Sequence, residues 1–518
     1  MTPDDFFVFS VGQKLPDLFF RGHAFFEEDF VIGESGLRNF ESERQRCAEI
    51  HEDGRYFLLR KEGSDHVAGT DFNGTMKLFL YRDSSKWALS NSFSKLLDFV
   101  RAAGWRITPQ PEHLNAWLLT GPFWQQLWSF KTAVDEIELV PAQAEIRISR
   151  SEIKLTMKST KPTAETYEQA MIRFISLWVN RTATLISTPG IFVKSDITGG
   201  VDSRINLALI MYAQSKLGLS MTNELTFNCG KHGRHREDFK VAERLSKFYR
   251  FPLNKPLSVP VSWRSSRECF EMWRLSSLGA YSPVYFPDHQ FSEKLVNIGG
   301  GGGERHRPFY PNTDIDTFFH KHEDKFVSEE FFQRIKIDVK EALERIFSTS
   351  DTINPMIAHY REFRDRLHSG LLANYSIRIS PLGSKYLQEA TSFKSSQEIA
   401  RNQVLFDAMN ALIPDLLTRP YDNPKKEPAK ECLDTLLLLP KCEVLIGKTF
   451  QGSGHERVST KKNDRRPIDH LAEHLSKIAK RNLASDAAMK TAVQQGKFSH
   501  PVDAKNIHAT ILENEISC

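Results

Sequence analysis

Residues 198–203 read Thr198-Gly199-Gly200-Val201-Asp202-Ser203 and separate an apolar run at 190–193 from a helical pattern beginning at Ile205. This order predicts a strand, a glycine turn and a helix. Paired glycines let backbone amides approach an anion closely, and the amino end of the helix attracts it. A carboxylate does not favour a bare phosphate, so we expect Asp202 to hold Mg²⁺ beside one. The segment predicts a phosphate-binding loop, with an ordinary strand-to-helix turn as the alternative.

Two common nucleotide-binding motifs do not fit this loop. A Walker A motif ends in Gly-Lys-Ser/Thr, which is absent here. A dinucleotide fingerprint requires a third glycine at the position of Ser203.

Composition limits the class of protein. A chain of 518 residues is long enough for two to four domains. A net charge of +4 is too small to indicate nucleic acid as a partner. The six scattered cysteines are typical of reduced thiols. No apolar run approaches the ~20 residues of a membrane span, and the acidic start does not resemble a signal peptide. We therefore expect a cytoplasmic location, with neither nucleic acid nor a membrane as partner.

Residues 5–150 have a β-rich pattern. Short apolar runs at 56–59, 76–81, 87–90 and 144–148 predict strands. Asn73-Gly74 favours a hairpin turn. We expect an α+β domain with antiparallel sheets.

Residues 165–305 alternate between the two patterns. Helices are predicted at 167–186 and at 237–249, where Val241, Leu245 and Phe248 share one face. Further strands are predicted at 225–227 and 295–298. Such alternation indicates a parallel sheet. Lys194-Ser195-Asp196 are polar for a buried strand, so we expect them to face a ligand or a domain interface.

The rest of the chain changes character twice. Residues 310–440 are mostly helical in pattern, and the chain becomes polar beyond 450. The basic run 461–467 suits either an anion site or a solvated tail, and we favour the tail.

A second glycine run, Gly299 to Gly303, ends in Glu304 and follows the strand predicted at 295–298. Ligands of open α/β sheets bind at the carboxyl ends of the strands, so both glycine loops are expected to face one ligand. Arg305, His306 and Arg307 follow and are expected to offer positive charge to phosphate or to a substrate carboxylate. A flexible linker is the alternative.

The first loop resembles the PP-loop, Ser-Gly-Gly-x-Asp-Ser, of the N-type ATP pyrophosphatases, with Thr198 keeping the hydroxyl. Together with the β-rich start and the second loop, it resembles the asparagine synthetase family, especially divergent asparagine synthase-related proteins of biosynthetic clusters. The resemblance implies a degenerate glutaminase-like domain of the Ntn-hydrolase type with antiparallel sheets at 1–155. It implies an α/β parallel-sheet PP-loop domain, with a helical C-terminal part, at 165–440. Residues 441–518 remain as a polar extension.

The family's site residues carry over by position. Glu304 matches the end of the second loop, and Asp202 matches the Mg²⁺-binding carboxylate. The positions that the resemblance places at ATP or pyrophosphate are Ile197, Thr198, Gly199, Gly200, Val201, Asp202, Ser203, Cys229, Ile298 and Gly299. Lys425 and Lys426 are candidates for a lysine that stabilises the adenylated intermediate, with a solvated surface pair as the alternative.

Three departures from the family stand out. Gly303 replaces an acidic residue that usually precedes the Glu, which removes a second metal ligand or transfers its role to Glu304. The segment 378–383 resembles a helical-domain motif, but Ser376 stands where a general base is usual. Thr2 replaces the nucleophilic cysteine, so we expect no glutaminase activity.

Cys229, His232 and His235 have a spacing that suits a metal, but we favour a basic loop near ATP because no fourth ligand is close.

The resemblance implies an ATP-dependent carbon–nitrogen ligase using ATP and Mg²⁺. It would adenylate a small-molecule or sugar carboxylate, release pyrophosphate and transfer the acyl group to ammonia or another amine, in a capsule or specialised-metabolite pathway. A different PP-loop enzyme and a non-catalytic descendant that binds nucleotide or a partner are the alternatives. A homodimer is one assembly that the sequence allows.

Overall fold

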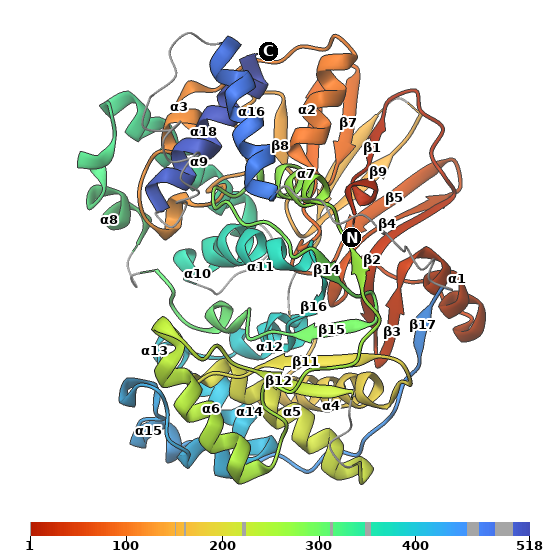
Figure 1. Cartoon of the computed structure of the whole chain (residues 1–518), viewed down its shortest axis with the longest axis vertical. Coiled ribbons are helices and arrows are strands. Elements are labelled where there is room, and N and C mark those ends of the chain that lie inside the picture. The colour runs from red at the N-terminus through yellow and green to blue at the C-terminus, as the bar shows by residue number, and fades with distance from the viewer. Residues whose placement is uncertain are drawn as a thin grey trace.

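The computed structural model describes residues 2–150, 152–159, 162–219, 224–310, 314–347, 354–452, 466–481 and 501–517. The chain has a mixed α/β architecture with antiparallel strands in its N-terminal part and a parallel sheet in its middle part (Figure 1). This confirms the expected combination of sheets.

The N-terminal part contains two sheets. One has the strand order β1-β7-β6-β8, with bounds Val8–Ser10, Lys86–Ser90, Phe79–Asp83 and Ile137–Leu139. The other has the order β10-β9-β5-β4-β2-β3-β17, with bounds Ile153–Met157, Ala144–Ile148, Asp65–Thr70, Gly54–Glu62, Leu18–Phe26, Asp29–Ile32 and Thr449–Gln451. All neighbours are antiparallel except β17, which pairs in parallel with β3.

The two sheets and the helices outside them form four layers. Alternate side chains of the facing strands, such as Leu80, Leu89 and Phe57, make one buried core between them. Helix α1 (Gly33–Arg44) covers the outer face of the larger sheet with Leu37 and Phe40. Helix α2 (Phe93–Ala102) lies on the outer side of the smaller sheet, and the short helix α3 (Pro111–Ala116) joins the same buried core.

The predicted hairpin at Asn73-Gly74 is wrong. Gly74 does occupy a turn, with φ of +59°. The turn nevertheless connects β5 and β6, which belong to different sheets. The Asp71 carboxylate closes it by accepting hydrogen bonds from the amides of Thr75 (2.8 Å) and Met76 (2.9 Å).

The middle part contains a four-stranded parallel sheet. Its order is β12-β11-β15-β16, with bounds Leu225–Asn228, Phe192–Asp196, Leu295–Ile298 and Ile377–Ile379. Helices that surround it in Figure 1 are α4 (Tyr167–Ser187), α5 (Val201–Leu217), α6 (Arg236–Tyr249), α12 (Lys385–Ser392) and α14 (Gln403–Leu412). Apolar side chains from the strands and helices form one core.

Two details of this sheet differ from expectation. Strand β16 lies in the region expected to be helical, so Arg378 sits on a strand. Phe248 of α6 is 54% exposed, because only Val241 and Leu245 of the predicted face turn inward. The polar end of β11 has a clear role, since Asp196 pairs with Arg378 (2.9 Å) and Ser195 is fully buried.

Helices dominate residues 310–440, as predicted. They are α8 (Ile315–His320), α9 (Glu329–Phe347), α10 (Pro355–His359), α11 (Arg366–Ala373), α13 (Ser396–Ala400) and α15 (Lys430–Leu433). A buried π-helical segment, Tyr360–Asp365, joins α10 to α11.

Two small strands, β13 (Ser262–Trp263) and β14 (Gln290–Phe291), flank α7 (Ser266–Ser277) in the sequence. No helix in the described ranges is long and apolar enough to cross a membrane.

The end of the chain returns to the N-terminal part. Strand β17 joins the larger sheet, while α16 (Pro467–Arg481) and α18 (Pro501–Ser517) lie near α2, α3 and α7 (Figure 1). Apolar residues of both helices join the core there, including Leu471 and Ile511. Most of the basic run 461–467 lies outside the described residues.

A buried ion pair joins the N-terminal part to the middle part. Arg181 of α4 is fully buried, and its Nη1 lies 2.5 Å from Oδ2 of Asp53, which is also buried. Asp53 also accepts hydrogen bonds from the Ser384 hydroxyl (2.7 Å) and the Lys385 amide (2.8 Å). Asp53 therefore fixes two elements of the middle part.

Asp53→Asn should destabilise the protein by about 3–5 kcal/mol, because it leaves the Arg181 charge buried without a counter-charge. Asp17→Asn is the matched control: Asp17 is 83% exposed in its pair with Lys61, so about 1 kcal/mol or less is expected. Chemical denaturation measures both. Equal losses would contradict the role of Asp53.

A second charged cluster lies under α18. Arg274 of α7 pairs with Glu515 (3.1 Å), Asp98 (2.8 Å) and Glu271 (3.3 Å). Three carboxylates thus share one guanidinium. Burial, reinforced by Asp98 and opposed by Arg274, raises the pKa of Glu515 to about 7.

The Glu515 carboxyl should make stability fall with rising pH. The folded protein binds this proton more tightly than the unfolded chain, whose glutamate pKa is ordinary. The contribution of this proton to stability is therefore fully present below about pH 4.5 and is lost as the pH rises to about 7, by about 3 kcal/mol. Glu515→Gln should flatten the free energy of unfolding across this window, whereas Glu513→Gln, at an exposed position, should not. An unchanged pH profile in Glu515→Gln would contradict the assignment.

Candidate functional site

Both glycine loops leave the carboxyl ends of adjacent parallel strands. The first loop, 198–203, follows β11 and leads into α5, and the second, 299–303, follows β15. Asn206 of α5 donates a hydrogen bond from Nδ2 to the carbonyl of Gly299 (2.9 Å). The start of α5 therefore lies against the second loop, and a ligand shared by the two loops remains a prediction.

Hydroxyl groups shape the first loop. Ser203 Oγ accepts from the Thr198 amide (2.9 Å), and Thr198 Oγ1 accepts from the Gly200 amide (3.3 Å). The Gly199 amide donates to Oδ1 of Asp238 (2.9 Å), at the start of α6. An anion that binds the Gly199 amide would therefore have to displace Asp238.

The two candidate lysines have different positions. Lys426 Nζ pairs with Asp422 (2.6 Å) and lies beside Gly200, 3.9 Å from where a Cβ on that residue would stand. The Asp422 amide in turn donates to the Gly199 carbonyl (3.3 Å). Lys425 contributes its backbone amide to a bond with Asn423. Lys426 is thus the lysine that the structure brings to the loop.

Asp202 lies between the second loop and Arg307. Its two oxygens accept from Nη1 and Nη2 of Arg307, both at 2.7 Å. Arg307 Nη2 also donates to Glu304 Oε1 (2.9 Å). A Cβ on Gly303 would lie 2.3 Å from Cγ of Asp202, so this contact requires a glycine.

The charges in this group interact strongly. Burial and repulsion by Asp202 raise the pKa of Glu304, while Arg307 opposes that shift. Burial alone would lower the pKa of Arg307, but the Asp202 and Glu304 carboxylates outweigh it and raise the pKa. Arg307 therefore stays charged and attached to both carboxylates.

Arg305 and His306 do not supply positive charge to the loop, contrary to expectation. Arg305 is buried and pairs with Asp365 of the π-helical segment (2.9 Å). His306 is buried between Thr391 Oγ1 (2.6 Å) and the Leu382 carbonyl (2.7 Å). Burial, together with Arg361, lowers its pKa well below the usual value, so the ring is neutral.

This arrangement does not fit a magnesium ion held by Asp202. Both oxygens of Asp202 are taken by a charged guanidinium, and position 303 has no room for an acidic side chain. Among the described residues, no three His, Cys, Asp or Glu side chains form a group that could hold a metal. Magnesium at Asp202 remains a prediction, and it requires Arg307 to move.

The remaining predicted contacts with ATP are mostly buried. Ile197 and Ile298 have side chains in the core of the parallel sheet, so only their main chains border the loops. Cys229 is also buried, and burial raises the pKa of its thiol to about 11. Its backbone is held by Asn254 through two hydrogen bonds (2.9 and 3.0 Å). The thiol is therefore protonated and chemically quiet.

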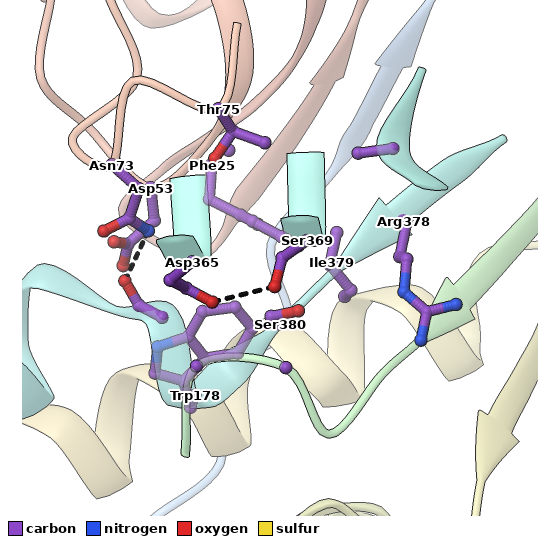
Figure 2. A pocket seen from close by; sticks show the side chains of 15 residues that line it. Phe25, Asp53, Asn73, Thr75, Trp178, Asp365, Ser369, Arg378, Ile379 and Ser380 are labelled. Carbon is purple, nitrogen blue, oxygen red and sulfur yellow. Dashed lines mark hydrogen bonds between the residues drawn. The ribbon is translucent and has the colours of Figure 1, made fainter. Parts of the chain in front are cut away.

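A cavity of about 50 Å³ lies behind the second loop (Figure 2). Its lining includes Gly301, Ser380, Arg378, Trp178 and, from the N-terminal part, Asp53. The space suits only a few water-sized molecules.

Two further positions at which the sequence departs from expectation are Ser376 and Thr2. Ser376 directly precedes β16 and offers a hydroxyl group instead of a carboxylate. Thr2 is nearly buried, with its amide donating to Asp5 Oδ2 (2.6 Å) and its hydroxyl 3.4 Å from the same oxygen. The absence of glutaminase activity remains a prediction.

Sequence reasoning missed three residues of the site. Asp238 contacts Gly199, Asp422 contacts the same loop, and Asn402 lies 3.4 Å from Arg307 Nη1. Asp238 lies in the first turn of the helix predicted at 237–249, and this was the only local signal. Asp422 and Asn402 reach the site from distant parts of the chain and had none.

Comparisons with known proteins add little. No family model matches the chain, and neither does any curated protein. A solved structure that matches is a glutamine phosphoribosylpyrophosphate amidotransferase from B. subtilis complexed with ADP and GMP, at 8% identity. The match covers 58% of this chain and 59% of that one, with a TM-score of 0.17. The chain thus matches less than two thirds of that enzyme, and the likeness is too low to inform fold or function.

Gly303→Ala should destabilise the protein by about 1–3 kcal/mol, because the added methyl meets the pinned Asp202 carboxyl. Gly300→Ala is the control, since its Cβ would make only ordinary contacts, the nearest at 3.5 Å. Asp202→Ala removes the atoms that the methyl meets. In that background Gly303→Ala should cost less, and thermal unfolding of the four variants in the cycle measures the coupling. Additive losses would show that the two residues do not meet.

Proposed function

We propose that the chain is an ATP-dependent amide-forming synthetase of the asparagine synthetase type. The observation that carries the proposal is the meeting of the two glycine loops at the start of α5, on adjacent parallel strands. Ligands of parallel sheets bind at this edge. The four-layered N-terminal part agrees with the glutaminase-like domain implied by the resemblance.

The proposed reaction has two steps. A carboxylate oxygen attacks the α-phosphorus of ATP, forming an acyl-adenylate and releasing pyrophosphate. Ammonia or another amine then attacks the acyl carbon, giving the amide and AMP. A small-molecule or sugar carboxylate is the proposed acyl substrate.

The chain's own groups would act on the leaving pyrophosphate. The amides of residues 199–203 and the positive end of α5 would stabilise that charge once Asp238 and Thr198 Oγ1, which accept from the Gly199 and Gly200 amides, give way. Lys426 stands beside Gly200 and adds a positive charge. Displacement of Asp238 would free the Gly199 amide for a phosphate oxygen. Such preorganised donors stabilise charge that develops during reaction.

A catalytically impaired descendant that binds nucleotide or a partner is the second candidate. The observation in its favour is the double hydrogen bond from Arg307 to Asp202, which occupies the expected metal ligand.

ATP–pyrophosphate exchange with a panel of carboxylates tests the proposal. At least one acid should promote exchange, and Lys426→Met should reduce it by about 10–100-fold, the effect of losing a charged contact in the transition state. Lys425→Met is the matched control and should keep full activity. Absence of exchange with every acid, together with retained ATP binding in calorimetry, would favour the impaired descendant. Equal losses in both lysine variants would contradict the role of Lys426.

A further inference from the structure

Arg307 makes four contacts with oxygen atoms. Nη1 lies 2.7 Å from Asp202 Oδ1 and 3.4 Å from Asn402 Oδ1. Nη2 lies 2.7 Å from Asp202 Oδ2 and 2.9 Å from Glu304 Oε1. Two carboxylates and an amide oxygen around one positive charge are also the donor set that a hard divalent cation prefers.

The guanidinium is held firmly in this place. Its contact with Asp202 is bidentate, the strongest geometry for an arginine and a carboxylate. Only about a fifth of either side chain is exposed, so water screens the pair weakly. Gly303 has no side chain, so Asp202 can come close to the second loop. Arg307 directly follows the helical turn that contains Glu304. The acidic pair and its cation therefore form one unit.

We propose that Arg307 is a built-in cation that occupies the position between Asp202 and Glu304 which a divalent metal would otherwise take. The site then holds no metal through protein carboxylates, and magnesium that accompanies a nucleotide is bound by phosphate oxygens alone. The statement about magnesium that accompanies a nucleotide rests on the proposed function. The statement that the two carboxylates hold no metal does not.

Titration with Mn²⁺ alone, followed by electron paramagnetic resonance of the free ion, tests this without nucleotide. The full-length wild-type protein should show no Mn²⁺ site tighter than about 1 mM, the weak end of protein-bound divalent cations. Arg307→Met, which keeps an unbranched stem but is shorter and carries no charge, should bind Mn²⁺ at least about tenfold more tightly. Adding Asp202→Asn to Arg307→Met should remove that gain. Arg38→Met, on an exposed pair with Glu34, should behave like wild type.

Tight Mn²⁺ binding by wild type that Asp202→Asn abolishes would overturn the inference. So would a folded Arg307→Met, checked by circular dichroism, that gains no Mn²⁺ site. The wild-type titration, with Asp202→Asn as its control, needs no Arg307 variant, so it can overturn the inference even if Arg307→Met does not fold. A failure of ATP–pyrophosphate exchange would count against the proposed function and would leave the Mn²⁺ result unchanged.

Discussion

The close approach of Asp202 to Gly303 is the constraint on which the site depends. A side chain at position 303 would overlap the carboxyl group of Asp202. Because residue 303 has none, the end of the second loop reaches the start of α5, and Arg307 binds Asp202 and Glu304 together. The glycine at position 303 and the arginine that binds the two carboxylates are therefore parts of one arrangement.

Buried polar groups support this arrangement from behind. The π-helical segment Tyr360–Asp365 supplies Asp365 to Arg305, and Arg361 donates two hydrogen bonds to the Arg305 carbonyl (2.9 and 2.6 Å). π-Helical turns are frequent at functional sites. These bonds fix the turn that carries Glu304 and Arg307. The same side of the middle part meets the N-terminal part through Asp53 and Arg181, so the loop lies close to the joint between the two parts.

Local patterns predicted much of the fold. Strands β9 and β15 have the bounds expected from their apolar residues, and α4 begins at Tyr167, where Thr166 caps the helix through the Gln169 amide. Long-range pairing was not predictable. Strand β16 has only three residues within a helical region, and β17 pairs with β3, which lies more than 400 residues earlier in the sequence. The sequence also could not distinguish Arg305 from Arg307, because charge alone does not show which side chain meets Asp365 and which meets Asp202.

A crystal structure of the protein soaked with α,β-methylene-ATP, which cannot release pyrophosphate, tests the central claim most directly. The account predicts that the phosphates lie against the amides of residues 199–203, with Lys426 near them and Arg307 still bound to Asp202. A nucleotide bound elsewhere, or a saturating soak that leaves this loop empty, would contradict it.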